Sequence, residues 1–129
     1  MCIFKVKVVA CNPRDERRVT VPVEALVDTG SDLTWLPAKV LRGIGVKPRG
    51  KKIVQVGADM PVERDIGYLF LHVNGHETAD EVVFAEPGDM VRLGFKTLEG
   101  FGLVDDPSHR FISITTLVAF CARKLAKAA

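Results

Sequence analysis

The chain has 129 residues, of which 47% are hydrophobic and 26% charged, and its formal net charge is +2. These proportions are typical of a globular protein and exclude a disordered or fibrous chain. The basic residues are scattered, which argues against a nucleic-acid partner. The start lacks the pattern of a signal peptide, and no apolar run reaches the roughly 18 residues of a membrane span. We therefore expect a single cytoplasmic domain over residues 1–129, with no membrane span.

The first third of the chain predicts short strands and one short helix. Apolar alternation predicts a strand over residues 3–9, and a return strand over residues 19–23 follows a turn. Pro22 marks an edge or bulge position in that return strand, because proline cannot donate to a ladder. A further short strand is expected over residues 33–36, and a helix that opens at a proline over residues 38–42.

The middle of the chain predicts a β-meander. Residues 53–56 and 66–73 are strand-like, and a turn is expected over residues 57–61. Asn74-Gly75 is a strong signal for a two-residue hairpin turn, so another strand should lead through residues 81–85.

The last third predicts a short strand over residues 91–93, a helical turn over residues 96–101 and a last strand over residues 110–114. Residues 115–129 form a helix-compatible tail in which basic residues come late. The predicted class is therefore all-β for the most part, with one or two short helices.

Cysteine and histidine residues offer only weak candidates for chemistry. Cys2, Cys11 and Cys121 form an odd set without C-x-x-C spacing, and we expect reduced structural thiols. A cysteine nucleophile is an alternative without a local signature. His72 and His76 have acidic neighbours, but a turn separates them. We expect no metal and no cofactor.

The triplet Asp28-Thr29-Gly30 is the strongest motif. It follows an apolar strand and precedes Ser31 and an apolar run that contains Trp35. Alone it is a weak signal, because the same residues form ordinary turns. Leu93-Gly94 lies downstream, before a short helical segment. This combination, from about Val21 to Ile114, resembles the retropepsin-like (clan AA) aspartic proteases of the bacterial and archaeal single-domain type.

The resemblance implies a retropepsin-like acid-protease β-barrel with a flap hairpin. Asp28 would be the catalytic carboxylate, Thr29 would hydrogen-bond across a dimer, and Gly30 would allow the tight turn. Ser31 would hydrogen-bond the outer oxygen of Asp28. The flap would span residues 53–71, and its tip would bind substrate through Gly57, Ala58, Asp59 and Met60.

Peptide hydrolysis by carboxylates needs two of them, because one must hold a proton while the other is ionised. The sequence contains one Asp-Thr-Gly. We therefore expect a homodimer with twofold symmetry, which acts as an aspartic endopeptidase (a hydrolase) on a peptide or protein substrate. Water would be activated between two Asp28 carboxylates.

Several residues depart from the family pattern and keep two other functions open. Arg92 stands where the family has an apolar residue, and we expect it to reach the surface or to pair with Asp32. Phe95 replaces an arginine of the viral enzymes, so dimer contacts should differ. A second hypothesis is therefore a retropepsin-like dimeric binding module with weak or no peptidase activity. A third hypothesis is a toxin-antitoxin or chaperone-like partner that uses the C-terminal amphipathic segment. For Trp35 we favour packing over a place in the substrate cleft.

Overall fold

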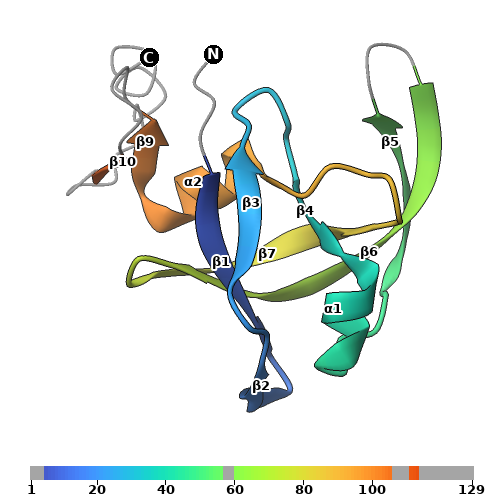
Figure 1. Ribbon diagram of the computed structural model, residues 1–129, viewed down its shortest axis with the longest axis horizontal. Coiled ribbons are helices and arrows are strands. Elements are labelled where there is room, and N and C mark those ends of the chain that lie inside the picture. The colour runs from blue at the N-terminus through green and yellow to red at the C-terminus, as the bar shows by residue number, and fades with distance from the viewer. Residues whose placement is uncertain (1–4, 57–59, 106–110, 114–129) are drawn as a thin grey trace.

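The computed structural model describes residues 5–56, 60–105 and 111–113 (Figure 1). Its strands are β1 (Lys5–Asn12), β2 (Asp15–Val19), β3 (Val23–Val27), β4 (Thr34–Pro37), β5 (Gly50–Val56), β6 (Met60–Val73), β7 (His76–Ala85), β8 (Arg92–Leu93), β9 (Leu103–Asp105) and β10 (Phe111–Ser113). Its helices are α1 (Ala38–Gly43) and α2 (Phe95–Phe101). Further predictions concern Cys2, Cys121, the flap-tip residues Gly57, Ala58 and Asp59, and the tail over residues 115–129; these lie outside the described residues.

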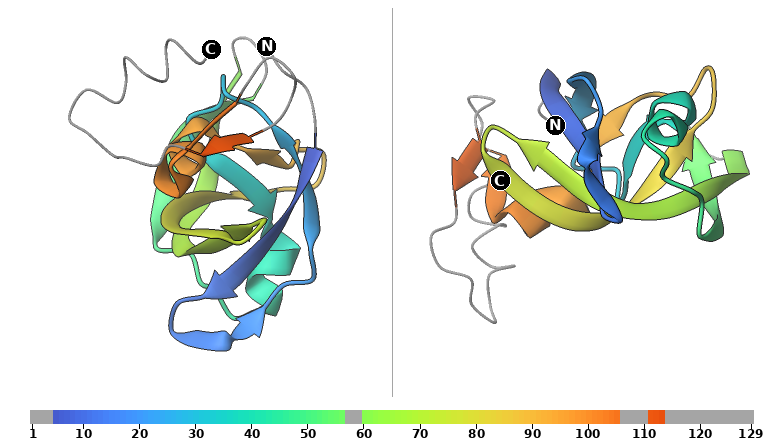
Figure 2. Two further views of the ribbon diagram at one scale, coloured as in Figure 1. Left: turned by 90° about the vertical axis from the view of Figure 1, so that its left-hand side faces the viewer. Right: turned by 90° about the horizontal axis from the view of Figure 1, so that it is seen from below.

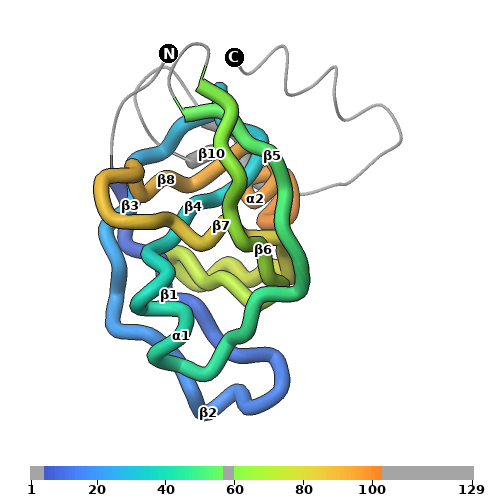
Figure 3. The backbone as a smooth tube through the Cα atoms, turned by 90° about the vertical axis from the view of Figure 1, so that its right-hand side faces the viewer, coloured from blue at the N-terminus to red at the C-terminus, as the bar shows by residue number. Residues whose placement is uncertain are grey.

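The main sheet closes into a barrel. The strand order is β2-β1-β3-β8-β4-β7-β6-β5, and β1 also pairs with β6, so the strands from β1 to β6 in this order form a ring. β2 projects from the lower end of the barrel in Figure 1 and again in Figure 3. α1 and α2 lie at opposite ends of the barrel, as the right-hand view of Figure 2 shows. The prediction of a mostly β barrel with short helices is confirmed.

Turn residues explain where the elements end. Asn74 and Gly75 have φ angles of 48° and 83°, which suits the tight hairpin between β6 and β7. Pro37 immediately precedes α1, and α2 ends at Gly102, whose φ of 73° is in the left-handed region. The predicted turn at Asn74-Gly75 and the predicted start of a helix at a proline are confirmed.

The predicted return strand over residues 19–23 is wrong. The return strand is β2, which pairs with β1 and ends at Val19, and Pro22 lies between β2 and β3. Thr20 fixes the break, because its N–H donates to the Ala10 carbonyl at 2.9 Å and its Oγ1 accepts from the Ala10 N–H at 3.0 Å. These bonds hold the chain against β1 before it turns into β3.

The core fills the inside of the barrel. Alternate residues of β6, namely Leu69, Leu71 and Val73, are at most 1% exposed, which is the two-residue period of a strand with one face buried. Gly67 lies earlier on β6, and a Cβ there would be 2.9 Å from the Phe84 ring. The largest fully buried side chains are Phe84, Leu36, Leu41, Leu69, Leu71, Leu93, Leu98, Val8, Val27, Val73 and Val82. None of the described helices is long and apolar enough to cross a membrane.

Candidate active site

Asp28 directly follows β3, and the barrel fixes its backbone. Its N–H donates to the Leu93 carbonyl at 3.0 Å, next to the parallel pairing of β3 with β8. Its Oδ1 accepts the Gly30 N–H at 3.0 Å, and its carbonyl accepts the Ser31 N–H at 3.1 Å. The Asp28 side chain is 17% exposed. The triplet is therefore a tight turn that holds a carboxylate at the end of a buried strand.

The segment Leu93-Gly94 supports this turn from below. Phe95 donates its N–H to the Ser31 carbonyl at 2.8 Å, and Lys96 donates to the Asp32 carbonyl at 3.1 Å. A Cβ on Gly94 would overlap the carbonyl group of Leu33. Only glycine lets the start of α2 approach the Asp28 loop this closely.

A largely buried chain of hydrogen bonds beside the same loop joins three elements, β4, α2 and β7. Thr97 Oγ1 lies 2.6 Å from Asp80 Oδ2, and Thr34 Oγ1 lies 2.6 Å from Thr97 Oγ1 and 2.9 Å from the Gly94 nitrogen. An ionised carboxylate only accepts, so Thr97 donates to Asp80. Thr34 must then donate to Thr97, while it accepts from the Gly94 N–H. Every proton in the chain is assigned, and β4, α2 and β7 are held together under the site.

The expectation for Ser31 is wrong, and the expectation for Thr29 stays a prediction. Ser31 Oγ donates to the Leu33 carbonyl at 2.8 Å and not to the outer oxygen of Asp28. The expected bond is wrong because the turn directs the hydroxyl toward its own loop, while the Gly30 N–H approaches the carboxylate. Thr29 is exposed at the tip of the turn, and a single chain does not test its expected bond across a dimer.

Arg92 contacts Asp28, which the sequence analysis missed. Its Nη1 lies 3.4 Å from Asp28 Oδ2, and its Cζ lies 5.2 Å from the centre of the Trp35 ring. The expected pair with Asp32 is therefore wrong. β8 runs between β3 and β4, and it pairs Arg92 with Leu26 on one side and with Trp35 on the other. Strand alternation was the available signal: Leu93 faces the core, so Arg92 faces the opposite side.

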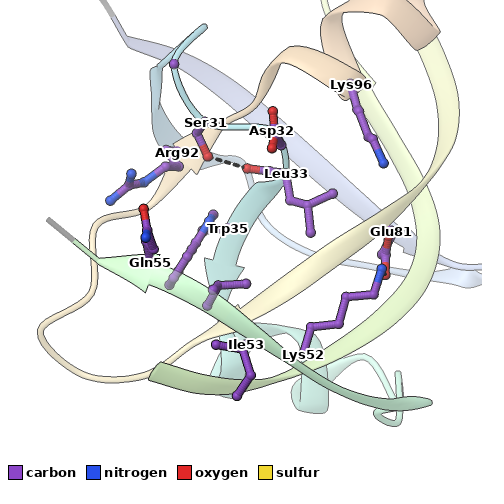
Figure 4. A pocket seen from close by; sticks show the side chains of 12 residues that line it. Ser31, Asp32, Leu33, Trp35, Lys52, Ile53, Gln55, Glu81, Arg92 and Lys96 are labelled. Carbon is purple, nitrogen blue, oxygen red and sulfur yellow. Dashed lines mark hydrogen bonds and ion pairs between the residues drawn. The ribbon is translucent and has the colours of Figure 1, made fainter. Parts of the chain in front are cut away.

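A pocket of about 620 Å³ adjoins the triplet. Figure 4 shows side chains from the Asp28 loop, β4, β5 and β8 around it. Its walls are Gly30, Ser31, Asp32, Leu33, Trp35, Lys52, Ile53, Val54, Gln55, Glu81, Arg92 and Lys96. Of the predicted site residues, Gly30 lines the pocket, whereas Asp28, Thr29 and Met60 do not. Met60 begins β6 and is 61% exposed. The body of β5, rather than Met60, therefore faces the triplet.

Trp35 and Cys11 are both buried. Trp35 is 3% exposed and packs in a cluster with Ile66, Val83 and Ala85, which confirms packing, although its ring also lines the pocket. Cys11 is a free thiol, and burial together with the charge of Glu16 raises its pKa. A thiol in this state is a poor nucleophile.

His72 Nε2 lies 3.3 Å from Glu77 Oε2 across the β6–β7 hairpin. Within residues 5–56, 60–105 and 111–113, no three His, Cys, Asp or Glu side chains are grouped as metal ligands would be.

Comparison with known proteins gives a fold. No protein-family model matches the sequence, and no curated protein matches it. The foamy viral protease-reverse transcriptase, solved with an RNA/DNA hybrid, is similar over 97% of this chain, with a TM-score of 0.55 and 16% identity. Its complex with double-stranded DNA gives a TM-score of 0.50 and 18% identity over 73% of this chain. This chain spans only 14% and 15% of those two chains.

A third similar structure is the EIAV protease with the inhibitor HBY-793, at a TM-score of 0.49 and 19% identity, over 78% of this chain and 89% of that chain. The fold is retropepsin-like. Identities this low define the fold alone, so the chemistry has to be argued from this chain's own residues.

Proposed function

We propose that this chain is one half of an aspartic peptidase of the single-domain retropepsin-like type. The observation that carries the proposal is the Asp28 carboxylate, held at the end of β3 by the Gly30 N–H, in a loop whose next residues Gly30 and Ser31 line a pocket. A carboxylate fixed by backbone donors on a rigid strand is a suitable base for activating water. The retropepsin-like fold supports the same conclusion.

The second carboxylate comes from a second copy of the chain. One Asp28 has to hold a proton while the other is ionised, so that the pair can activate water and protonate the peptide carbonyl. Twofold symmetry places two identical loops face to face. Thr29, exposed at the tip of its turn, then bonds across the dimer, and Gly30 permits the turn beneath the carboxylates.

The β5–β6 hairpin is the proposed flap. Ile53, Val54 and Gln55 of β5 line the pocket beside the triplet, and β5 ends the order of the main sheet. An extended peptide between this hairpin and the Asp28 loop would be shielded from water during hydrolysis. Contacts to the tip residues 57–60 would complete the enclosure.

A second candidate function is a dimeric binding module without peptidase activity. The contact between Arg92 Nη1 and Asp28 Oδ2 at 3.4 Å favours it, because a guanidinium occupies the side of this oxygen that a water between two Asp28 carboxylates would need. In the peptidase, Arg92 has to release that oxygen when substrate and the second subunit arrive.

Cleavage of a diverse peptide library at several pH values, at high protein concentration, tests the proposal. Wild type is compared with Asp28→Asn and with Glu24→Gln, which changes an exposed carboxylate on the strand before Asp28, and the mass of each in solution is determined. Cleavage that Glu24→Gln retains and Asp28→Asn loses, with all three dimeric, supports the peptidase. Silent but dimeric wild type favours the binding module, and a monomer that cleaves peptides refutes the shared site.

A further inference from the structure

Arg64 and Arg92 contact carboxylates in very different ways. Arg64 forms a two-point pair with Asp89, with Nε and Nη2 at 2.7 and 2.9 Å from its two oxygens. Arg92 has one contact, with Asp28 at 3.4 Å. Arginine matches a carboxylate best through two parallel hydrogen bonds. Arg64 therefore has the two-point pair that a guanidinium prefers, and Arg92 does not.

The Arg92 guanidinium is also held in place without being satisfied. Its Nε is buried, and it has no hydrogen-bond partner among the described residues. The Trp35 ring, 5.2 Å from Cζ, fixes the position of the group. The side chain is only 17% exposed. A mostly buried guanidinium with an unpaired Nε and only one long contact to a carboxylate is costly for the free protein, so it indicates a ligand.

Arg92 and Lys52 lie at opposite ends of the pocket and differ in how their charges are paired. In Figure 4, Arg92 and Gln55 lie at one end of the pocket, next to Ser31, while Lys52 and Glu81 lie at the other end. Lys52 Nζ is 2.6 Å from Glu81 Oε2, so these two charges offset each other. The charged groups near the Arg92 end are Asp32, which Figure 4 shows beside Ser31, and Asp28, whose Oδ2 lies 3.4 Å from Arg92 Nη1. Because this contact with Asp28 is long, the guanidinium can still take the carboxylate of a ligand in the pocket.

β5 indicates that this ligand is a peptide. In the main sheet β5 pairs only with β6, so its other edge presents backbone N–H and C=O groups. Extended peptides add to such edges. Residues 52–55 of β5 also line the pocket, so a peptide on this edge would pass Arg92 and carry a side chain to it.

We propose that Arg92 forms an acid-binding subsite, which takes the carboxylate of a Glu or Asp side chain within one residue of the scissile bond. The position of the bond rests on the proposed function, because Arg92 contacts Asp28 directly. On binding, the guanidinium stays over Trp35 and exchanges its long contact with Asp28 for the peptide carboxylate, which frees Asp28 Oδ2 for the dyad. The substrates are then peptides with an acidic residue at the cleavage site.

The test uses pairs of peptides that differ only by Glu or Gln at the positions flanking the bond, which keeps shape and changes charge. Dissociation constants are measured with reduced-bond versions of these peptides, and kcat/KM with the cleavable ones. Wild type is compared with Arg92→Gln, Arg92→Lys and Lys47→Gln. Lys47 is an exposed lysine between α1 and β5 and serves as a matched change of charge. Circular dichroism verifies that each variant is folded.

Wild type and Lys47→Gln should prefer Glu over Gln by about tenfold or more, the range expected for hydrogen bonds to a charged group. Arg92→Gln should lose the preference, and Arg92→Lys should keep part of it, because it retains the charge without the fork. Equal affinities of wild type for the Glu and Gln peptides overturn the subsite. Cleavage without a Glu preference leaves the peptidase and removes the subsite. Binding with a Glu preference but without cleavage supports the subsite and refutes the peptidase.

Discussion

Replacing Thr97 by valine tests the hydrogen-bond chain beneath the site. Thr97 is fully buried, donates to Asp80 Oδ2 and accepts from Thr34 Oγ1, both at 2.6 Å. Valine keeps the shape of the side chain and removes only the hydroxyl. Asp80 then loses a charge-assisted bond and the Thr34 hydroxyl loses its acceptor, so the free energy of unfolding should fall by about 2–4 kcal/mol.

Urea denaturation at one fixed protein concentration measures this change, because dimerisation would make the stability depend on concentration. Thr97→Ser keeps the hydroxyl and should cost about 1 kcal/mol for the lost methyl group. In a double-mutant cycle with Thr34→Val, the two losses should not add, because both variants break the same chain. If the free energy of unfolding of Thr97→Val stays within about 0.5 kcal/mol of that of wild type, these hydrogen bonds do not stabilise the fold as argued.

Two further predictions concern the support of the site and acid stability. Gly94→Ala should lower the free energy of unfolding by about 1–3 kcal/mol, because the new Cβ overlaps the backbone of Leu33. Gly43→Ala is the control, because there is open space around its Cβ. Equal urea midpoints for the two variants would contradict the prediction. The hydrogen bond from Arg64 lowers the pKa of Asp89 below its ordinary value. The ionised Asp89 therefore stabilises the fold above about pH 4, and this contribution is lost as pH falls through the lowered pKa. Asp89→Asn should show a weaker fall of melting temperature between pH 5 and 2, and a fall as steep as in wild type would refute this.

Local signals predicted much of the fold. Apolar alternation indicated β6 and β7, and the tight turn at Asn74-Gly75 depends only on its own two residues. The prediction that Leu93-Gly94 belongs with the Asp28 triplet came from family resemblance, and its physical basis is the close approach of Gly94 to Leu33. That contact joins distant parts of the chain, so no local pattern reveals it.

Two of the errors came from long-range pairing, whereas the wrong partner of Ser31 came from the local turn. The return strand over residues 19–23 looks favourable alone, but the bonds between Thr20 and Ala10 decide where β2 ends. The partner of Arg92 depends on the placement of β8 between β3 and β4. Alternation gives the face on which Arg92 lies, whereas the neighbour on that face follows only from the order of strands in the sheet.

Stability measurements distinguish a structural arginine from one kept for a ligand. Removing one partner of a buried, well-formed pair leaves an uncompensated charge, so Arg64→Met should lower the free energy of unfolding by about 3–5 kcal/mol. Arg92→Met keeps the packing on Trp35 and removes a guanidinium whose Nε has no partner and whose contact with Asp28 is long, at 3.4 Å, while Asp28 retains its bond from the Gly30 N–H. Its stability should therefore equal that of wild type or exceed it by about 1 kcal/mol.

Paired urea titrations of the two variants measure the contrast. If Arg92→Met is destabilised as much as Arg64→Met, then Arg92 is part of the folded framework, and its unpaired Nε does not indicate a ligand. If it is not destabilised, the fold gains nothing from a guanidinium at this position. The reason for Arg92 then lies in what it binds beside Asp28.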